Sequence, residues 1–121
     1  ELAYLHAEAL LAGELKHGPL TMLTEESPVI ALAPLDGTYD RVIQAVREAR
    51  ARGAPMTVLT DNHDDALESL ADEIIYLPST ERCFSPILMT VALQVIAYYC
   101  ALERGFPIDR PRNLAKSVTV F

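Results

Sequence analysis

Pro28-Val29-Ile30-Ala31-Leu32-Ala33 is a short, continuous apolar run that lies between Ser27 and Pro34. Strands buried on both faces of a parallel sheet have this pattern, because helices cover both faces. Residues 55–60 and residues 74–77 are two further short runs of the same kind. We therefore expect three strands of an α/β domain with a largely parallel sheet, joined by right-handed crossovers.

Two segments have the pattern of longer helices. Residues 39–52 carry an apolar stripe, with Thr38 placed to cap the start and Gly53 to end the helix. Residues 87–104 follow Ser85-Pro86, which is a favourable helix start, and Gly105 comes directly after them. This last helix is apolar nearly all round, so we expect it to be buried or to lie in a subunit interface.

The pattern of the first twelve residues fits both a helix and a strand. Leu2, Leu5 and Ala9 are spaced as on one helix face, while Ala7, Ala9 and Leu11 alternate as in a strand. Periodicity does not choose between them. Residues 13–23 then predict a short helix or helical turn, and residues 67–71 predict one helical turn at most.

The composition narrows the class of protein. A chain of 121 residues, half of them apolar, suits one compact domain with a real core. The net charge is −7 and no run of Lys and Arg forms a basic stripe, so we do not expect a nucleic-acid partner. The sequence contains neither GxGxxG nor GxxxxGK[ST], the glycine-rich loops that bind phosphates of nucleotides.

Other features bear on the compartment. Cys83 and Cys100 form no CxxC or Cys/His metal pattern, and Cys100 is expected to be a small buried apolar residue. A reducing cytoplasm fits this cysteine usage. No signal peptide opens the chain and no uninterrupted apolar run reaches the length of a membrane span, so we expect no membrane partner. Because the chain begins at Glu1 without a methionine, we interpret it as a fragment of a longer protein.

Residues 13–20, Gly-Glu-Leu-Lys-His-Gly-Pro-Leu, place a carboxylate, an ammonium and an imidazole in four positions before a Gly-Pro break. Imidazole titrates near neutral pH, so His17 is a candidate for proton transfer. The alternative is a solvated helix end at which Lys16 and His17 lie near the last carbonyls.

Three blocks of sequence together resemble a known family. They are Tyr4-Leu5-His6-Ala7-Glu8-Ala9, then Gly13-Glu14-Leu15-Lys16-His17-Gly18-Pro19, and the tail Pro111-Arg112-Asn113-Leu114-Ala115-Lys116-Ser117-Val118-Thr119-Val120. They are similar to the C-terminal end of the glutamine–fructose-6-phosphate aminotransferases (isomerizing), also called glucosamine-6-phosphate synthases. The resemblance covers essentially the whole chain.

The resemblance implies a doubly wound three-layer sandwich with a mostly parallel sheet. Residues 1–106 would be a second sugar isomerase (SIS) domain that lacks its first strand, and residues 107–121 a tail that closes the isomerase site. A helix would end near residues 1–3, residues 6–12 would form a strand, and residues 13–23 would form the next helix. A glutaminase domain and a first SIS domain would lie upstream.

The resemblance also implies catalytic roles for three residues. Glu1 would move a proton between C1 and C2 of the sugar, and His17, reaching the site from the neighbouring subunit, would open the sugar ring. Lys116 would form a Schiff base with the open-chain sugar, and Ala115 and Lys116 would contact the substrate. The implied substrate is fructose 6-phosphate, the implied assembly is a homodimer with a shared active site, and no cofactor or metal is needed.

Other residues have plainer interpretations. His6 is expected to be a structural histidine with its hydrogen bonds satisfied, and His63 to lie in a solvated acidic loop rather than a metal site. Tyr98 and Tyr99 are expected in the core or an interface. Phe121 departs from the family, which usually ends in an acidic residue.

Two alternative functions stay open beside the aminotransferase. SIS domains also occur in transcription regulators that bind sugar phosphates without turnover, and related folds serve phosphosugar isomerases and deaminases. Under the enzyme interpretation, we expect the isolated fragment to be inactive.

Overall fold

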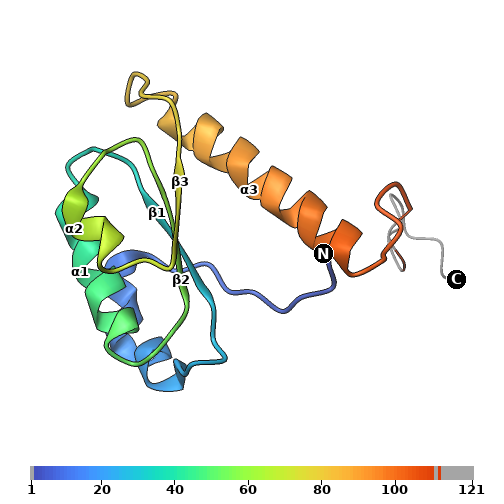
Figure 1. Ribbon diagram of the computed structural model, residues 1–121, viewed down its shortest axis with the longest axis horizontal. Coiled ribbons are helices and arrows are strands. Elements are labelled where there is room, and N and C mark those ends of the chain that lie inside the picture. The colour runs from blue at the N-terminus through green and yellow to red at the C-terminus, as the bar shows by residue number, and fades with distance from the viewer. Residues whose placement is uncertain (1, 111, 113–121) are drawn as a thin grey trace, which may run out of the picture. The chain divides into compact units, whose positions relative to one another are not determined.

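The computed structural model describes residues 2–110 and residue 112 (Figure 1). Two compact units divide the chain: residues 9–89 form one, and residues 1–8 with residues 90–121 form the other. Glu1, Ala115 and Lys116 lie outside the described residues.

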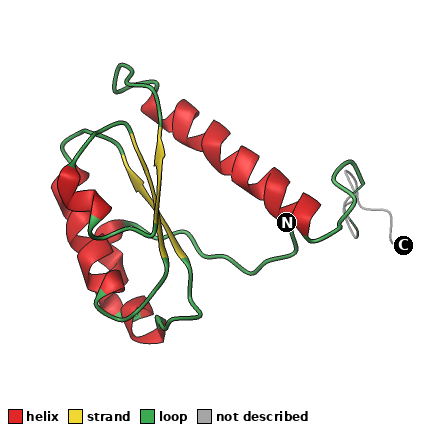
Figure 2. Ribbon diagram, viewed as in Figure 1, coloured by secondary structure: helices red, strands yellow, loops and turns green. Residues whose placement is uncertain are grey.

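The unit of residues 9–89 is built on a parallel sheet (Figure 2). Its strands are β1 (Val29–Ala33), β2 (Met56–Thr60) and β3 (Glu73–Tyr76), in the order β1-β2-β3. Ala31 pairs with Val58, which pairs with Ile74. The three apolar runs are therefore the three strands, and the predicted α/β class with a parallel sheet is confirmed.

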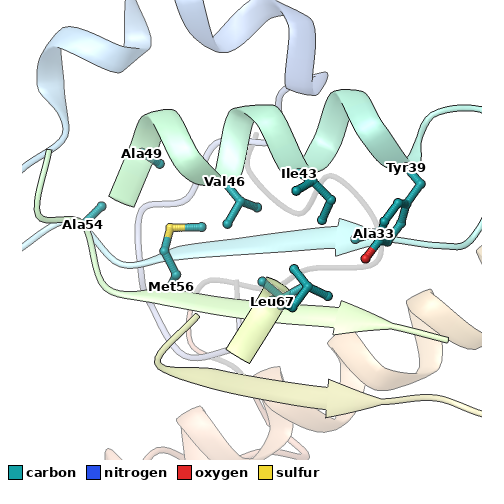
Figure 3. Packing of buried hydrophobic residues seen from close by; sticks show 9 residues of the cluster. Ala33, Tyr39, Ile43, Val46, Ala49, Ala54, Met56 and Leu67 are labelled. Atoms are coloured by element: carbon teal, nitrogen blue, oxygen red, sulfur yellow. The ribbon is translucent and has the colours of Figure 1, made fainter. Parts of the chain in front are cut away.

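Helix α1 (Tyr39–Arg50) packs its apolar stripe on one face of this sheet (Figure 3). Ile43, Val46 and Ala49 point toward the strands, and Leu67 of the short helix α2 (Asp65–Glu68) joins the same cluster. Burying such a side chain stabilises the fold by about 1.5–3 kcal/mol. The cluster consists of Ala33, Tyr39, Ile43, Val46, Ala49, Ala54, Met56, Val58 and Leu67.

The ends of these helices differ in how they are capped. Thr38 occupies the predicted position before α1, but its hydroxyl donates to Asp36 Oδ1 at 2.6 Å instead of capping the helix. Asp64 caps α2 by accepting the Ala66 N–H at 2.9 Å. Gly53 follows α1 with φ +83°, as predicted, and a Cβ there would lie 2.9 Å from Glu25 Cγ.

The opposite face of β1 is open. Ile30 is 45% exposed and Leu32 is 36% exposed, so the prediction of a strand covered on both faces is wrong for β1 in this chain. The run is apolar enough for such a strand, yet Ile30 and Leu32 remain partly exposed.

The N-terminal predictions also need correction. Residues 4–11 form neither helix nor strand, so the strand expected at residues 6–12 is absent. A strand needs a neighbour that satisfies its N–H and C=O groups, and β1 pairs only with β2 in the described sheet. The helix expected to end at residues 1–3 is replaced by a turn at Leu2 and Ala3.

Residues 13–23 are helical but divided. A 3₁₀ helix, η1, spans Ala12–His17, and a second, η2, spans Pro19–Met22. Gly18 between them has φ +133°, and Pro19 has no N–H to continue a helical ladder. One continuous helix was the wrong expectation, because Gly-Pro breaks it.

Helix α3 (Ser85–Glu103) is the longest, and Gly105 follows it with φ +70°. Its apolar side chains are mostly exposed. The helix is therefore not buried as one expectation had it, and the alternative, a place in a subunit interface, stays a prediction. Cys100 is half-buried rather than buried. The exposed apolar residues of α3 are Ile87, Val91, Val95, Tyr98, Tyr99 and Leu102.

Within the described part of the chain, α3 alone is long and apolar enough to cross a membrane by length and composition. Thr90 and Gln94 interrupt its apolar sequence, so it is not an uninterrupted apolar run. One such helix is weak evidence, because core helices of proteins without membrane spans meet the same criterion.

Candidate active site

His17 is the last residue of η1 and is exposed. The turn that follows it is held by Thr21, whose N–H and hydroxyl both donate to the Gly18 carbonyl, at 2.9 and 2.7 Å. The positive φ of Gly18 reverses the chain directly after the imidazole. The backbone that carries His17 is therefore fixed by local chemistry.

The same helix is held against α1 by an ion pair. Lys16 Nζ lies 2.9 Å from Glu48 Oε1, which also accepts a hydrogen bond from Gln44 Nε2 at 2.9 Å. The hydrogen bonds from Gln44 and then Lys16 lower the pKa of Glu48. Leu15 packs on the core cluster beneath α1. These contacts hold η1 against α1, and the next residue, His17, is exposed.

A second set of contacts lies in the unit of residues 1–8 and 90–121. The backbone N–H of Arg112 donates to the Tyr4 hydroxyl at 2.6 Å, and the Arg112 guanidinium lies 4.1 Å from the centre of the Tyr4 ring. Phe106 meets the same ring edge-on, with centroids 4.6 Å apart. We call Tyr4, Phe106 and Arg112 the tail clasp. It joins residues 108 positions apart, and nothing in the local sequence predicts that they meet.

The carboxyl ends of the strands form a third polar region. Thr60 donates to the Ala33 carbonyl at 2.7 Å, and Asp61 Oδ1 accepts the Leu35 N–H at 2.7 Å. Asp36 accepts from the Thr38 hydroxyl and N–H, and these bonds lower its pKa. These polar groups satisfy one another's hydrogen bonds and fix the loops that follow β1 and β2.

Side chains of the acidic loop after β2 also have partners within the protein. Tyr39 donates its hydroxyl to Asp64 Oδ2 at 2.9 Å, and burial, followed by the contact with Asp64, raises the pKa of Tyr39. His63 is exposed and stacks on Tyr76 at 4.3 Å. In residues 2–110 and 112, no three His, Cys, Asp or Glu side chains are grouped as metal ligands.

With this geometry in place, comparison with known proteins identifies the fold family. The family model of the SIS domain matches residues 1–104. The chain belongs to the SIS domain family. The C-terminal domain of glucosamine-fructose-6-phosphate aminotransferase from Francisella tularensis superposes with a TM-score of 0.77 at 30% identity, over 90% of this chain and 31% of that one.

Relatives by sequence carry a consistent name. Glutamine–fructose-6-phosphate aminotransferase (isomerizing) of Symbiobacterium thermophilum is 47% identical over 120 residues, which are 99% of this chain and 20% of that protein. The protein of the same name from Methanosarcina acetivorans is 44% identical over 120 residues, 99% of this chain and 19% of the relative. This SIS domain chain thus spans about a fifth of the length of these relatives.

The structure of this SIS domain places one of the predicted catalytic residues. His17 is described, whereas Glu1, Ala115 and Lys116 are outside the described residues, so the structure brings none of them together. His6 was expected to be a structural histidine, but its side chain is 92% exposed and lies 3.9 Å from Glu8 Oε1. Sequence reasoning missed Tyr4 and Arg112, although both lie in blocks that carry the family resemblance.

Proposed function

We propose that this chain is the second SIS domain and the closing tail of a cytoplasmic glutamine–fructose-6-phosphate aminotransferase, with the domain at residues 1–106 and the tail at residues 107–121. The observation that carries the proposal is the 44–47% identity to enzymes of that name over 120 residues, which takes in both ends of the chain. The parent enzyme transfers ammonia from glutamine to fructose 6-phosphate and isomerises the product to glucosamine 6-phosphate.

In this proposal three side chains act on the sugar. The Lys116 amine attacks the C2 carbonyl of the open-chain sugar and releases water to give a Schiff base, for which it must be partly unprotonated. Ammonia then adds at the imine carbon and displaces the Lys116 amine, which leaves the free fructose imine. Glu1 takes a proton from C1 of this imine and returns one to C2, which a carboxylate does best when its pKa is raised toward the working pH. Lys116 and Ala115 also contact the substrate. No cofactor or metal is required for these steps.

His17 supplies the proton transfer that opens the ring. Its place at the end of η1, exposed and on a fixed turn, suits a side chain that enters the site of a neighbouring subunit. We propose a homodimer with shared active sites on this ground and on the exposed apolar face of α3. The substrate is a sugar phosphate, and the glutaminase and first SIS domain belong to the parent chain.

The test is borohydride trapping in the full-length enzyme with fructose 6-phosphate. We expect a reduced covalent adduct on Lys116, identified by mass spectrometry, and none in the Lys116→Arg variant. Sugar-phosphate binding without an adduct would instead indicate a sensor. Conversion of fructose 6-phosphate to an aldose phosphate without incorporation of nitrogen would indicate an isomerase of another kind.

A further inference from the structure

Helix η1, which carries His17, has few features that would stabilise it alone. In the described part of the chain it is a 3₁₀ helix of six residues with no side-chain hydrogen bond at its start and no buried residue. Runs of 3₁₀ helix longer than three or four residues are uncommon, because their hydrogen bonds are poorly aligned. The place of the His17 imidazole therefore depends on contacts between η1 and the rest of the unit of residues 9–89.

Helix α1 supplies the polar part of these contacts through Glu48. Lys16 Nζ lies 2.9 Å from Glu48 Oε1, and Gln44, one turn earlier on α1, donates to the same oxygen at 2.9 Å. Val46 and Ala49, on either side of Glu48 along α1, belong to the buried cluster that holds this helix on the sheet. The Glu48 carboxylate is therefore a fixed point to which η1 is attached.

Stability of the fold does not by itself explain a carboxylate at this position. The Lys16 side chain is 53% exposed, and ion pairs with an exposed partner add little to the stability of a protein. Glu48 Oε2 is buried, and the described residues give it no hydrogen-bond partner. A buried oxygen without a partner costs free energy, so Glu48 is better explained by the residue that it holds in place.

We propose that Glu48 is a positioning residue that acts through Lys16 to fix the His17 imidazole for opening of the sugar ring. This inference rests on the proposed function. Ring opening breaks the C2–O5 bond of the furanose, delivers a proton to O5 and removes the proton of the C2 hydroxyl, which becomes the carbonyl. Because Lys16 directly precedes His17, loss of the ion pair displaces the imidazole, and a small displacement of a reacting group slows the reaction.

The test compares two substrates of the full-length enzyme. 5-Deoxyfructose 6-phosphate has no hydroxyl at C5, so it forms no furanose ring and needs no ring opening. We expect Glu48→Ala and Lys16→Ala to lower kcat/KM for fructose 6-phosphate about three- to tenfold, and that for the deoxy sugar by less than about twofold. Mass spectrometry measures both amino sugar products. A merely structural defect would lower both values equally, which would contradict the inference.

Three further variants identify the contact that matters. Glu48→Gln keeps the shape and an oxygen acceptor but loses the charge, so it should recover part of the rate lost in Glu48→Ala. The double variant of Lys16→Ala with Glu48→Ala should be no slower than the worse single variant, because both act through one contact. Arg50→Ala is the matched control: it removes an ion pair of 2.8 Å from α1, but to Asp72 rather than to η1. Multiplying losses in the double variant, or the same selective loss in Arg50→Ala, would overturn the inference.

One more variant separates this inference from the proposed function. His17→Ala should lower kcat/KM for fructose 6-phosphate more than Glu48→Ala does and spare the deoxy sugar. If His17→Ala affects the two substrates alike, the proposed role of His17 fails and the inference fails with it. If His17→Ala gives the selective loss while Glu48→Ala and Lys16→Ala do not, the proposed function stands and the positioning role of Glu48 fails.

Hydrogen exchange measures the attachment of η1 directly. We expect backbone amides of residues 12–17 to exchange several-fold faster in the Glu48→Ala enzyme than in the unmodified enzyme, because a segment that loses its contacts opens more often. Mass spectrometry of the peptide that covers these residues follows the exchange, and Arg50→Ala should leave it unchanged. Equal exchange in the Glu48→Ala and unmodified enzymes would contradict anchoring of η1 by Glu48.

Discussion

At the scale of single residues, the turn after His17 depends on one backbone angle. Gly18 has φ +133°, and no atom lies within 4 Å of the position that a Cβ would take. Any cost of Gly18→Ala therefore comes from the backbone and not from a clash. Because the conformation is one that only glycine adopts readily, the turn and the placement of the imidazole rest on this glycine.

We expect Gly18→Ala to lower the free energy of unfolding by about 1–3 kcal/mol, measured by urea denaturation. Gly37→Ala is the matched control, since a Cβ there also meets no atom within 4 Å and no unusual φ is involved. The control should be neutral or more stable by up to about 1 kcal/mol. Equal changes in the free energy of unfolding at the two positions would show that the φ angle of Gly18 does not cause the loss of stability.

At the scale of elements, one carboxylate ties the start of β2 to the end of α1. Asp72 Oδ2 accepts the Met56 N–H at 2.7 Å and lies 2.8 Å from Arg50 Nη1. The Met56 hydrogen bond, and then Arg50, lower the pKa of Asp72 below its ordinary value of 3.8. The folded state thus binds this proton less tightly than the unfolded state does, so the contact contributes stability above the unfolded pKa.

That stability is lost as the pH falls through the lowered folded pKa. We expect the original chain to be more stable than Asp72→Asn at pH 7, and this difference in the free energy of unfolding to shrink as the pH falls below about 3.8. Denaturation series of both proteins at pH 7, 5, 4 and 3 measure this difference in the free energy of unfolding. A difference that stays constant across this range would contradict the assigned charge effect.

The exposed face of α3 carries a second prediction at this scale. Charge placed in an apolar interface is costly, so Val95→Glu should shift the full-length enzyme from dimer toward monomer in sedimentation velocity. Met22→Glu is the control, because it adds the same charge at an exposed apolar position of η2. A dimer that resists Val95→Glu would remove α3 from the proposed interface.

The elements also show how far sequence reasoning reaches. The runs at Val29–Ala33 and Met56–Thr60 are short, apolar and bounded, so local pattern suffices to find these strands. Residues 6–12 are different, because a strand exists only where another strand pairs with it, and that partner is not readable locally. The exposure of α3 likewise depends on what lies beside it. In the candidate site, the Gly-Pro break after His17 could be predicted from the local sequence. The contact of Tyr4 with Arg112 could not, because it joins residues 108 positions apart.

At the scale of the whole molecule, the chain spans about a fifth of the enzymes that it resembles. Under the proposed function, the glutaminase that supplies ammonia and the first SIS domain that binds the sugar phosphate lie in the remaining four-fifths. Even with Glu1, His17 and Lys116 all present, the reacting groups would face a sugar that no phosphate site holds. Orientation of the substrate supplies a large part of catalysis, so its loss cannot be replaced by the reacting groups alone.

We therefore expect the 121-residue chain to make no measurable glucosamine 6-phosphate from fructose 6-phosphate, either with glutamine or with ammonium chloride as the nitrogen source. Ammonium removes the need for the glutaminase, so the second condition isolates the missing sugar site. The full-length enzyme, assayed in the same two conditions, is the control and should form product with glutamine. Product from the short chain with ammonium alone would mean that this SIS domain binds and orients the sugar by itself, and the division of labour proposed between the two SIS domains would be wrong.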